Sequence, residues 1–310
     1  MLIVAADHGE AFGEHGQTQH GGSLHEELTH IPLLIRVPGQ AGREVAEPVS
    51  LIDLGPTILD LFQQPTPGAF LGQSLVPLLA GDTRVNSYTT DTQIFPTVIH
   101  LSGPSAGQYM VIWQSNGQDS DGYGVFAQRY DSNGAAIGAE FQVSTTTPGN
   151  QGADSGVRAA ALADGGFVVA WEAPDGWSRG IFAQRFNADG SADGASFQVN
   201  AYTDSSQGQS AVAALGGGAF VVVWASYGQD GSYQGIYGQR FDGAGNPAGA
   251  EFRVNYSVSG DQIRPAVAGL TNGGFVVTWD DYSNVWLQQY DASGRAIDSQ
   301  VPINNVSTEY

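Results

Sequence analysis

The sequence predicts a mixed fold, in which a short α/β segment is followed by an all-β region built from four-stranded repeats. Two observations support this prediction. The first 84 residues combine short apolar runs with a helical pattern, whereas the later chain repeats one strand pattern that ends in Trp. A polar, aperiodic stretch separates the two regions. We therefore expect a first domain over 1–84, a linker over 85–93 and a second domain over 94–310.

Apolar runs and helix signals order the elements of the first domain. In chain order we expect a buried strand over 1–6, a Gly- and His-rich loop over 7–22, a short helix over 23–29, a strand over 31–37 and a helix over 51–63. Pro56 is expected to break the first turn of the last helix. Because these residues supply few of the strands of a doubly wound sheet, we expect the segment to be poorly packed or docked on the repeats.

Four Trp residues mark the repeats of the second domain, at intervals of 53 to 58 residues. They close the apolar segments Tyr109–Trp113, Phe167–Trp171, Phe220–Trp224 and Phe275–Trp279. A short strand precedes each segment, and a second strand, a turn ending in Gly and a further strand follow it. The repeats span 94–145, 155–200, 208–255 and 262–304. This spacing is typical of β-propeller blades, so we expect a propeller-like domain of four blades, closed or part of a larger ring.

Composition and charge argue against several kinds of partner. The net charge is −20 and all 11 basic residues are Arg, which disfavours nucleic acid and anionic membrane surfaces. No apolar run approaches the roughly 20 residues of a membrane-spanning helix. The first six residues are too short for the core of a signal peptide and lack a positive leader. The absence of Cys excludes disulfides and thiolate metal sites.

Histidines concentrate near the N-terminus, where five of the six lie in the first 30 residues. Asp7 and His8 directly follow the first predicted strand, and open α/β sheets place their chemistry at the carboxyl ends of strands. A carboxylate oxygen beside an imidazole nitrogen is part of many divalent-metal sites. We therefore expect a metal or anion site here, the alternative being a solvated polar loop.

Residues 1–84 contain a series of motifs in a fixed order. They are Asp7-His8-Gly9-Glu10, Phe12-Gly13-Glu14-His15-Gly16, His20-Gly21, Leu24-His25-Glu26-Glu27, 30–36, 48–54, 56–61, Gly72-Gln73-Ser74-Leu75 and 77–79. Together these motifs resemble the C-terminal half of a sulfatase catalytic domain. The resemblance implies the alkaline phosphatase superfamily, whose members hydrolyse sulfate or phosphate esters at a metal-assisted nucleophile. It implies that Asp7 and His8 bind a divalent metal, with calcium favoured and manganese or zinc as alternatives. It also suggests His20 as a basic residue near the sulfate.

The chain departs from this family at the nucleophile. The family uses a Cys or Ser in a Cys/Ser-x-Pro-x-Arg motif, converted to formylglycine, and this sequence contains neither form of the motif. No catalytic residue is therefore assigned, and we expect no turnover from this chain alone. The sequence resembles a truncated or broken sulfatase, or two unrelated genes joined together, so whether the chain acts as an enzyme stays open.

Two loops of the repeats carry candidate calcium ligands. Asp119 and Asp121 lie in the loop after Trp113, and Asp230 lies in the loop after Trp224. Oxygen-bearing side chains at alternate positions followed by Gly are typical of calcium loops, although Asp-Gly also suits plain hairpins. The aromatic residues beside the repeat loops, Tyr123, Trp177 and Tyr233, are candidates for stacking on sugar rings.

The Arg that recurs in the second strand of three repeats is expected to be architectural rather than ligand-binding. Arg129, Arg185 and Arg240 occupy this position, and Gln289 replaces them in the last repeat. A residue that recurs in every unit of a repeat array usually supports the array itself.

Two functions of different kinds follow from the sequence. Residues 1–84 imply a metal-dependent sulfuric ester hydrolase acting on a sulfate or phosphate ester. The repeats resemble those of large secreted bacterial repeat proteins, which implies a secreted or cell-surface module that binds carbohydrate, protein or calcium. The repeat region covers more of the chain than the sulfatase-like region does.

Overall fold

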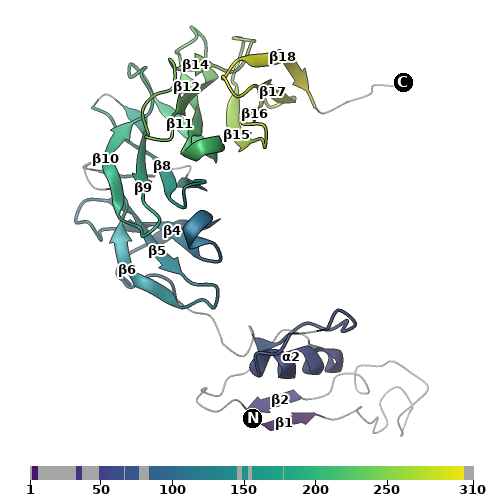
Figure 1. Ribbon diagram of the computed structural model, residues 1–310. Helices are drawn as coiled ribbons and strands as arrows, with labels where there is room; N and C mark the ends of the chain where they lie inside the picture. Colours follow the sequence, from purple (N-terminus) through teal and green to yellow (C-terminus); the bar gives the residue numbers. More distant parts are fainter. Residues whose placement is uncertain are drawn as a thin grey trace, which may run out of the picture. The chain divides into compact units, whose positions relative to one another are not determined.

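The computed structural model describes residues 2–5, 33–36, 49–65, 67–76, 84–144, 149–152, 156–176 and 178–303. The chain forms two compact units, residues 1–84 and 85–310 (Figure 1). The described part is mostly β, with four four-stranded antiparallel sheets and few helices. None of its helices is long and apolar enough to cross a bilayer.

The first unit contains a two-stranded antiparallel sheet. Strands β1 (Leu2–Ala5) and β2 (Leu33–Arg36) pair with Leu2 opposite Arg36. Leu2, Val4 and Leu34 are more than half exposed, so the prediction that the first apolar run is buried is wrong. Burial of a sheet requires another layer on each of its two faces. Among the described residues, no such layer covers the side chains of Leu2, Val4 and Leu34.

The helix of the first unit begins with a tight turn. The 3-10 turn η2 (Leu51–Asp53) leads into α2 (Leu54–Leu61), which contains Pro56 in its first turn. The 3-10 turn before α2 agrees with the predicted disturbance at the start of this helix. Pro56 is tolerated in the first turn of α2 because a backbone N–H there needs no helical partner. The Asp53 carboxylate accepts the Ser50 N–H at 2.9 Å and the Gln73 N–H at 2.8 Å, which ties residues 72–75 to the helix.

Four repeat sheets make up the second unit, and each contains four strands in sequence order. Sheet 1 contains β3 (Gln93–His100), β4 (Tyr109–Asn116), β5 (Tyr123–Tyr130) and β6 (Ala136–Gln142). Sheet 2 contains β7 (Arg158–Ala161), β8 (Phe167–Pro174), β9 (Arg179–Phe186) and β10 (Ala192–Gln198). Sheet 3 contains β11 (Gln207–Ala214), β12 (Phe220–Tyr227), β13 (Gln234–Phe241) and β14 (Phe252–Arg253). Sheet 4 contains β15 (Ile263–Gly269), β16 (Phe275–Asp280), β17 (Val285–Tyr290) and β18 (Ala296–Pro302). Short 3-10 turns η3 (Gly103–Ser105) and η4 (Gly216–Gly218) lie between the first two strands of sheets 1 and 3.

The sheets follow one another in chain order, as the ribbon view shows (Figure 1). Their first strands contact one another: β3 packs against β7, β7 against β11, and β11 against β15. Three hydrophobic cores fill the junctions between consecutive sheets. Trp171, Trp224 and Trp279 are almost completely buried in these cores, so the repeated Trp is a packing residue.

The last strand of the repeats differs from the predicted one. The sequence predicts it only over 141–143, 197–199, 252–254 and 301–303. Instead, β6, β10 and β18 begin directly after the preceding turn and include a register shift. In sheet 3 the strand is reduced to Phe252–Arg253, and Pro247 forms only an isolated bridge to Phe241. Proline lacks the N–H that a continuous ladder requires.

Candidate functional site

The predicted sulfatase-like residues Asp7, His8 and His20 lie outside the described residues. The described strand β1 ends at Ala5, two residues before Asp7. Among the described residues of this unit, the acidic side chains are Asp53 and Asp60, and both have structural partners. Asp53 accepts the Gln73 N–H at 2.8 Å, and Asp60 accepts the Ser74 hydroxyl at 2.6 Å.

The Asp119 and Asp121 carboxylates brace the loop between β4 and β5. Asp119 Oδ1 accepts the Asp121 N–H at 3.3 Å, and Asp121 Oδ2 accepts the Gly149 N–H at 3.0 Å. Gln142 donates its side-chain amide to Asp119 Oδ2. The bond from the Asp121 N–H to Asp119 is that of an Asx-type turn, whereas Gly149 and Gln142 reach these carboxylates from more distant segments.

Asp230 occupies the same position in the loop between β12 and β13. Its Oδ1 accepts the Ser232 N–H at 3.1 Å, while the neighbouring Gln229 donates to Glu251. In sheet 1 the equivalent Gln118 donates to Glu140 in the same way. No group of three or more His, Cys, Asp or Glu residues in the described ranges is arranged to hold a metal ion.

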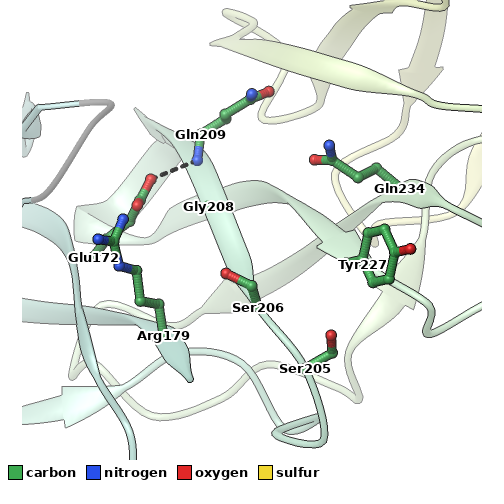
Figure 2. A pocket seen from close by; sticks show the side chains of 8 residues that line it. All are labelled: Glu172, Arg179, Ser205, Ser206, Gly208, Gln209, Tyr227 and Gln234. Atoms are coloured by element: carbon green, nitrogen blue, oxygen red, sulfur yellow. Dashed lines mark hydrogen bonds between the residues drawn. The ribbon is translucent and has the colours of Figure 1, made fainter. Parts of the chain in front are cut away.

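A polar groove lies between sheets 2 and 3. It has a volume of about 340 Å³ and is lined by Glu172, Arg179, Ser205, Ser206, Gly208, Gln209, Tyr227 and Gln234. Figure 2 shows Glu172 and Arg179 on one side and Tyr227 and Gln234 on the other. Tyr227 is 48% exposed, so its ring is available to a ligand. The groove therefore combines an aromatic ring with hydroxyl, amide and charged groups.

The floor of the groove is held by a left-handed residue in a β-bulge. Gln209 has φ of 55°, and the β11–β12 register shifts between Gly208 and Ala211. The Gln209 N–H is thereby turned toward sheet 2, where it donates to Glu172 Oε1 at 2.7 Å (Figure 2). Phe95 and Arg264 have the same positive φ in the bulges of sheets 1 and 4.

Gln209 also connects sheet 3 to sheet 4. Its Oε1 accepts the Arg264 N–H at 2.7 Å. The Arg264 guanidinium donates to both oxygens of Asp280, at 2.6 and 2.7 Å, and lies 5.4 Å from the centre of the Tyr282 ring. These hydrogen bonds lower the pKa of Asp280 and raise the pKa of Arg264.

Sequence reasoning missed a pair of polar residues in the segment that leads into the first strand of each repeat sheet. Asn200 Oδ1 accepts the Ile181 N–H at 2.7 Å, and its amide donates to Gln207 Oε1 at 3.0 Å. The equivalent pairs are Asn86–Gln93, Ser144–Gln151 and Asn255–Gln262. All four pairs are spaced by seven residues, and this spacing is the signal that the sequence offered.

The repeated Arg contacts the turn of the following sheet. Arg129 donates to the Ala188 carbonyl at 2.8 Å, and Arg240 donates to the Ala292 carbonyl at 2.8 Å. Arg185 pairs with Asp164 and Asp193 within sheet 2. These contacts confirm the architectural role predicted for the repeated Arg.

Comparison with known proteins places a sulfatase-like part at the start of the chain. The sulfatase family model matches residues 1–64. Arylsulfatase K of Danio rerio is 43% identical over 81 residues, which is 26% of this chain and 15% of the relative. Human arylsulfatase K is 34% identical over 138 residues, covering 42% of this chain and 25% of the relative. The uncharacterized sulfatase YidJ of Escherichia coli is 37% identical over 75 residues, covering 24% and 15%.

These alignments cover between 15% and 25% of the relatives' length. Among solved structures, a protein of unknown function from Dyadobacter fermentans is similar with a TM-score of 0.48 and 11% identity, over 69% of each chain. The Aleuria aurantia fucose-specific lectin is similar with a TM-score of 0.41 and 15% identity, over 65% of this chain and 59% of the lectin.

Proposed function

We propose that the first unit is part of a metal-dependent sulfuric ester hydrolase. The match of residues 1–64 to the sulfatase family model supports this proposal. Asp7 and His8 would bind the metal, since a carboxylate and an imidazole are suitable ligands for calcium, manganese or zinc. The bound divalent metal would orient the nucleophile and polarise the ester. His20 would lie near the sulfate of the substrate.

Turnover requires a nucleophile that this sequence does not supply. The chain contains neither Cys nor a Ser-x-Pro-x-Arg motif, so we propose that it is inactive alone. Two ligands also bind a divalent metal weakly, because affinity depends on ligand number and geometry. Ile52, Phe62 and Leu71 of the first unit are exposed apolar side chains, and we propose that they contact the polypeptide that carries the nucleophile.

Limited proteolysis with mass spectrometry tests the metal site. Calcium or manganese is expected to slow cleavage within residues 1–84, and Asp7→Ala or His8→Ala should abolish this protection. His100→Ala and Asp204→Ala serve as controls that leave the predicted ligands intact. Equal cleavage of the wild type with and without metal would contradict the site.

A complementation assay tests the reaction itself. A second polypeptide carrying the Cys/Ser-x-Pro-x-Arg region of a related sulfatase is mixed with this chain, and hydrolysis of an aryl sulfate is compared with that of an aryl phosphate. Restored activity that depends on Asp7 supports the proposal. Absence of activity from two polypeptides that are folded and associated would refute it.

We propose as a second function that the repeat unit is a propeller-like module that binds carbohydrate. The polar groove at Tyr227 favours this function, because an exposed aromatic ring with nearby hydroxyl and amide groups suits a sugar ring. Exposed Tyr233 lies next to Gln234 of the groove, whereas Trp177 lies outside the described residues. A secreted or cell-surface location, in the manner of large bacterial repeat proteins, belongs to this proposal.

Titration calorimetry with neutral oligosaccharides, selected on a glycan array, tests the binding function. Tyr227→Ala and Gln234→Ala are expected to weaken binding at least tenfold. Tyr256→Ala, an exposed Tyr outside the groove, should bind like the wild type. Carbohydrate binding that survives both groove substitutions would exclude this groove as the binding site.

Parallel melting curves with calcium and with chelator test whether Asp119, Asp121 and Asp230 bind calcium.

A further inference from the structure

Each repeat sheet has two apolar faces with different patterns. Along the second strand of a sheet, alternate side chains point to opposite faces. We call the face toward the following sheet the forward face and the opposite one the backward face. Met110 and Ile112 of sheet 1 point forward and share a core with Phe167, Val169 and Trp171 on the backward face of sheet 2.

The other two junctions repeat this arrangement. Val168 and Ala170 of sheet 2 pack against the backward residues Phe220, Val222 and Trp224. Val221 and Val223 of sheet 3 pack against Phe275, Val277 and Trp279. The third strand adds Val125 and Ala127, then Ile181 and Ala183, then Ile236 to the forward faces. All of these forward residues are completely buried.

The forward face of sheet 4 has the same design but is only partly buried. Val276 and Thr278 are half-buried, and Leu287 beside them is half-buried as well. Val285, which corresponds to the buried Val125, Ile181 and Ile236, is 39% exposed. Among the described residues, no further sheet packs on this face.

The backward face of sheet 1 is also incompletely covered. Tyr109 and Val111 are half-buried, although their counterparts in the other sheets are fully buried. Val98, which pairs with Val111 across the ladder, is 61% exposed. The Tyr109 and Tyr130 rings stack at 5.2 Å, much as Phe167 and Phe186 stack at 4.8 Å, so this face keeps the shape of a backward face.

We propose that these two faces bind each other between two copies of the chain. The forward face of sheet 4 in one copy would pack on the backward face of sheet 1 in the next. The internal junctions define what fits each face, and both faces belong to the same chain. This inference is independent of the hydrolase and carbohydrate proposals.

Such a contact is head-to-tail, so it forms a closed ring or an open series of copies. Internal junctions contain an additional contact from the repeated Arg, as when Arg240 of sheet 3 reaches the turn of sheet 4. Gln289 stands at this position in sheet 4. Because its side chain is shorter, the junction between copies is expected to be weaker than the internal ones and to depend on concentration.

Sedimentation velocity of the full chain from about 1 to 100 μM tests the proposal. This range is chosen because interfaces between proteins can have dissociation constants in the micromolar range. The mass is expected to rise above the 32.5 kDa of one copy. Val285→Arg on the forward face and Val98→Arg on the backward face should each keep the protein monomeric. Val258→Arg, at an exposed apolar residue outside both faces, should associate like the wild type.

Mixing the two face variants distinguishes a head-to-tail contact from a symmetric one. The Val98→Arg copy keeps its forward face and the Val285→Arg copy keeps its backward face, so the mixture should form pairs that neither variant forms alone. A wild type that stays monomeric throughout, or face variants that associate like the wild type, would overturn the proposal. Since the chain has no Cys, a Val98→Cys and Val285→Cys double variant adds a second test. We expect the two Cys residues to form a disulfide between copies. A disulfide closed within a single chain would also overturn the proposal.

Discussion

The Gln209 N–H donates to Glu172 Oε1 at 2.7 Å and thereby connects sheet 3 to sheet 2 across the groove. This contact depends on the left-handed conformation of Gln209, which points a backbone donor out of its own ladder. Glu172 follows the buried Trp171 and is itself buried. One carboxylate thus satisfies a backbone donor that the β-bulge would otherwise leave unpaired.

Removing the Glu172 carboxylate is expected to destabilise the second unit. Glu172→Ala should lower the free energy of unfolding by about 1–3 kcal/mol, because it leaves a donor without its acceptor. Glu172→Gln keeps an oxygen acceptor, so its free energy of unfolding should fall by less than that of Glu172→Ala. All six Trp residues lie in the second unit, so Trp fluorescence during urea unfolding reports on it. The exposed Asp204→Ala is the control, and equal stability of Asp204→Ala and Glu172→Ala would contradict this role.

Gly208 is expected to be required only because Glu172 is present. A Cβ at Gly208 would lie 3.1 Å from Glu172 Oε1, and Gly208 does not have a left-handed φ. The corresponding positions at the next junction are occupied by Ala225 and Ile263, a small residue and a large one. Gly208→Ala should therefore destabilise the wild type but be neutral or stabilising in a Glu172→Ala background, with a coupling of about 0.5–3 kcal/mol.

Urea unfolding of the four proteins of this double-mutant cycle measures the coupling. Gly216→Ala is the matched control, since a Cβ there meets open space. It should show the same effect in both backgrounds. A Gly208→Ala effect that is independent of Glu172 would show that the glycine is needed for another reason.

The sequence predicts the repeats of this fold better than the contacts between them. The Trp segments and the turns at Gly134, Gly190, Gly245 and Gly294 lie where their patterns indicate, because strand alternation and turn chemistry are local. The bulges at Phe95, Gln209 and Arg264 carry no local signature, since left-handed φ values are unusual for these residue types. Gln209 and Arg264 donate their backbone N–H groups to side chains of the preceding sheet. Such contacts between sheets carry no local sequence signal, and the groove was missed for the same reason.

Burial in the first unit shows another limit of local reasoning. Leu2 and Val4 form the expected strand but remain exposed, because burial depends on covering layers rather than on the strand itself. The hydrogen-bonding role of Asp119 in its loop could not be separated from calcium binding by spacing alone, since both uses place Asp oxygens in a Gly-containing loop.

Asn255 is expected to be essential to the connection between sheets 3 and 4. Its Oδ1 accepts the Ile236 N–H at 2.7 Å, and its amide donates to Gln262 at 2.8 Å and to the Ser257 carbonyl at 2.6 Å. Asn255→Ala should cost about 1–3 kcal/mol for each buried group that loses its partner. Ser144 makes the equivalent bonds in sheet 1, so Asn255→Ser should be less harmful than Asn255→Ala in urea unfolding. Equal losses of stability in Asn255→Ser and Asn255→Ala would show that a Ser hydroxyl does not replace the Asn255 side chain.

The Arg264–Asp280 pair is expected to make the second unit sensitive to acid. The hydrogen bonds from Arg264 lower the pKa of Asp280 in the folded protein. The resulting stability is present above the unfolded carboxyl pKa of about 3.9 and is lost as the pH falls through the lower folded value. Asp280→Asn should therefore lose stability at pH 6 and show a shallower further decline below pH 4. Thermal melting from pH 6 to pH 2.5 measures this, and an unchanged acid profile would contradict it.

Two buried tyrosines are expected to limit stability in alkali. Burial raises the pKa of Tyr237 to about 12, with a contribution from the charge of Asp230, and burial also raises the pKa of Tyr290. Above pH 10 the unfolded state loses these protons while the folded state retains them, so the free energy of unfolding falls as the pH rises from 10 to 12.

Phe occupies the equivalent positions at Phe182 and Phe186, which shows that a Phe ring fits the repeat. The Tyr237→Phe and Tyr290→Phe double variant should melt like the wild type at pH 7 and at a higher temperature at pH 11. Tyr256→Phe, at an exposed ring, should match the wild type at both pH values, and a double variant that gains nothing at pH 11 would show that other groups govern alkaline unfolding.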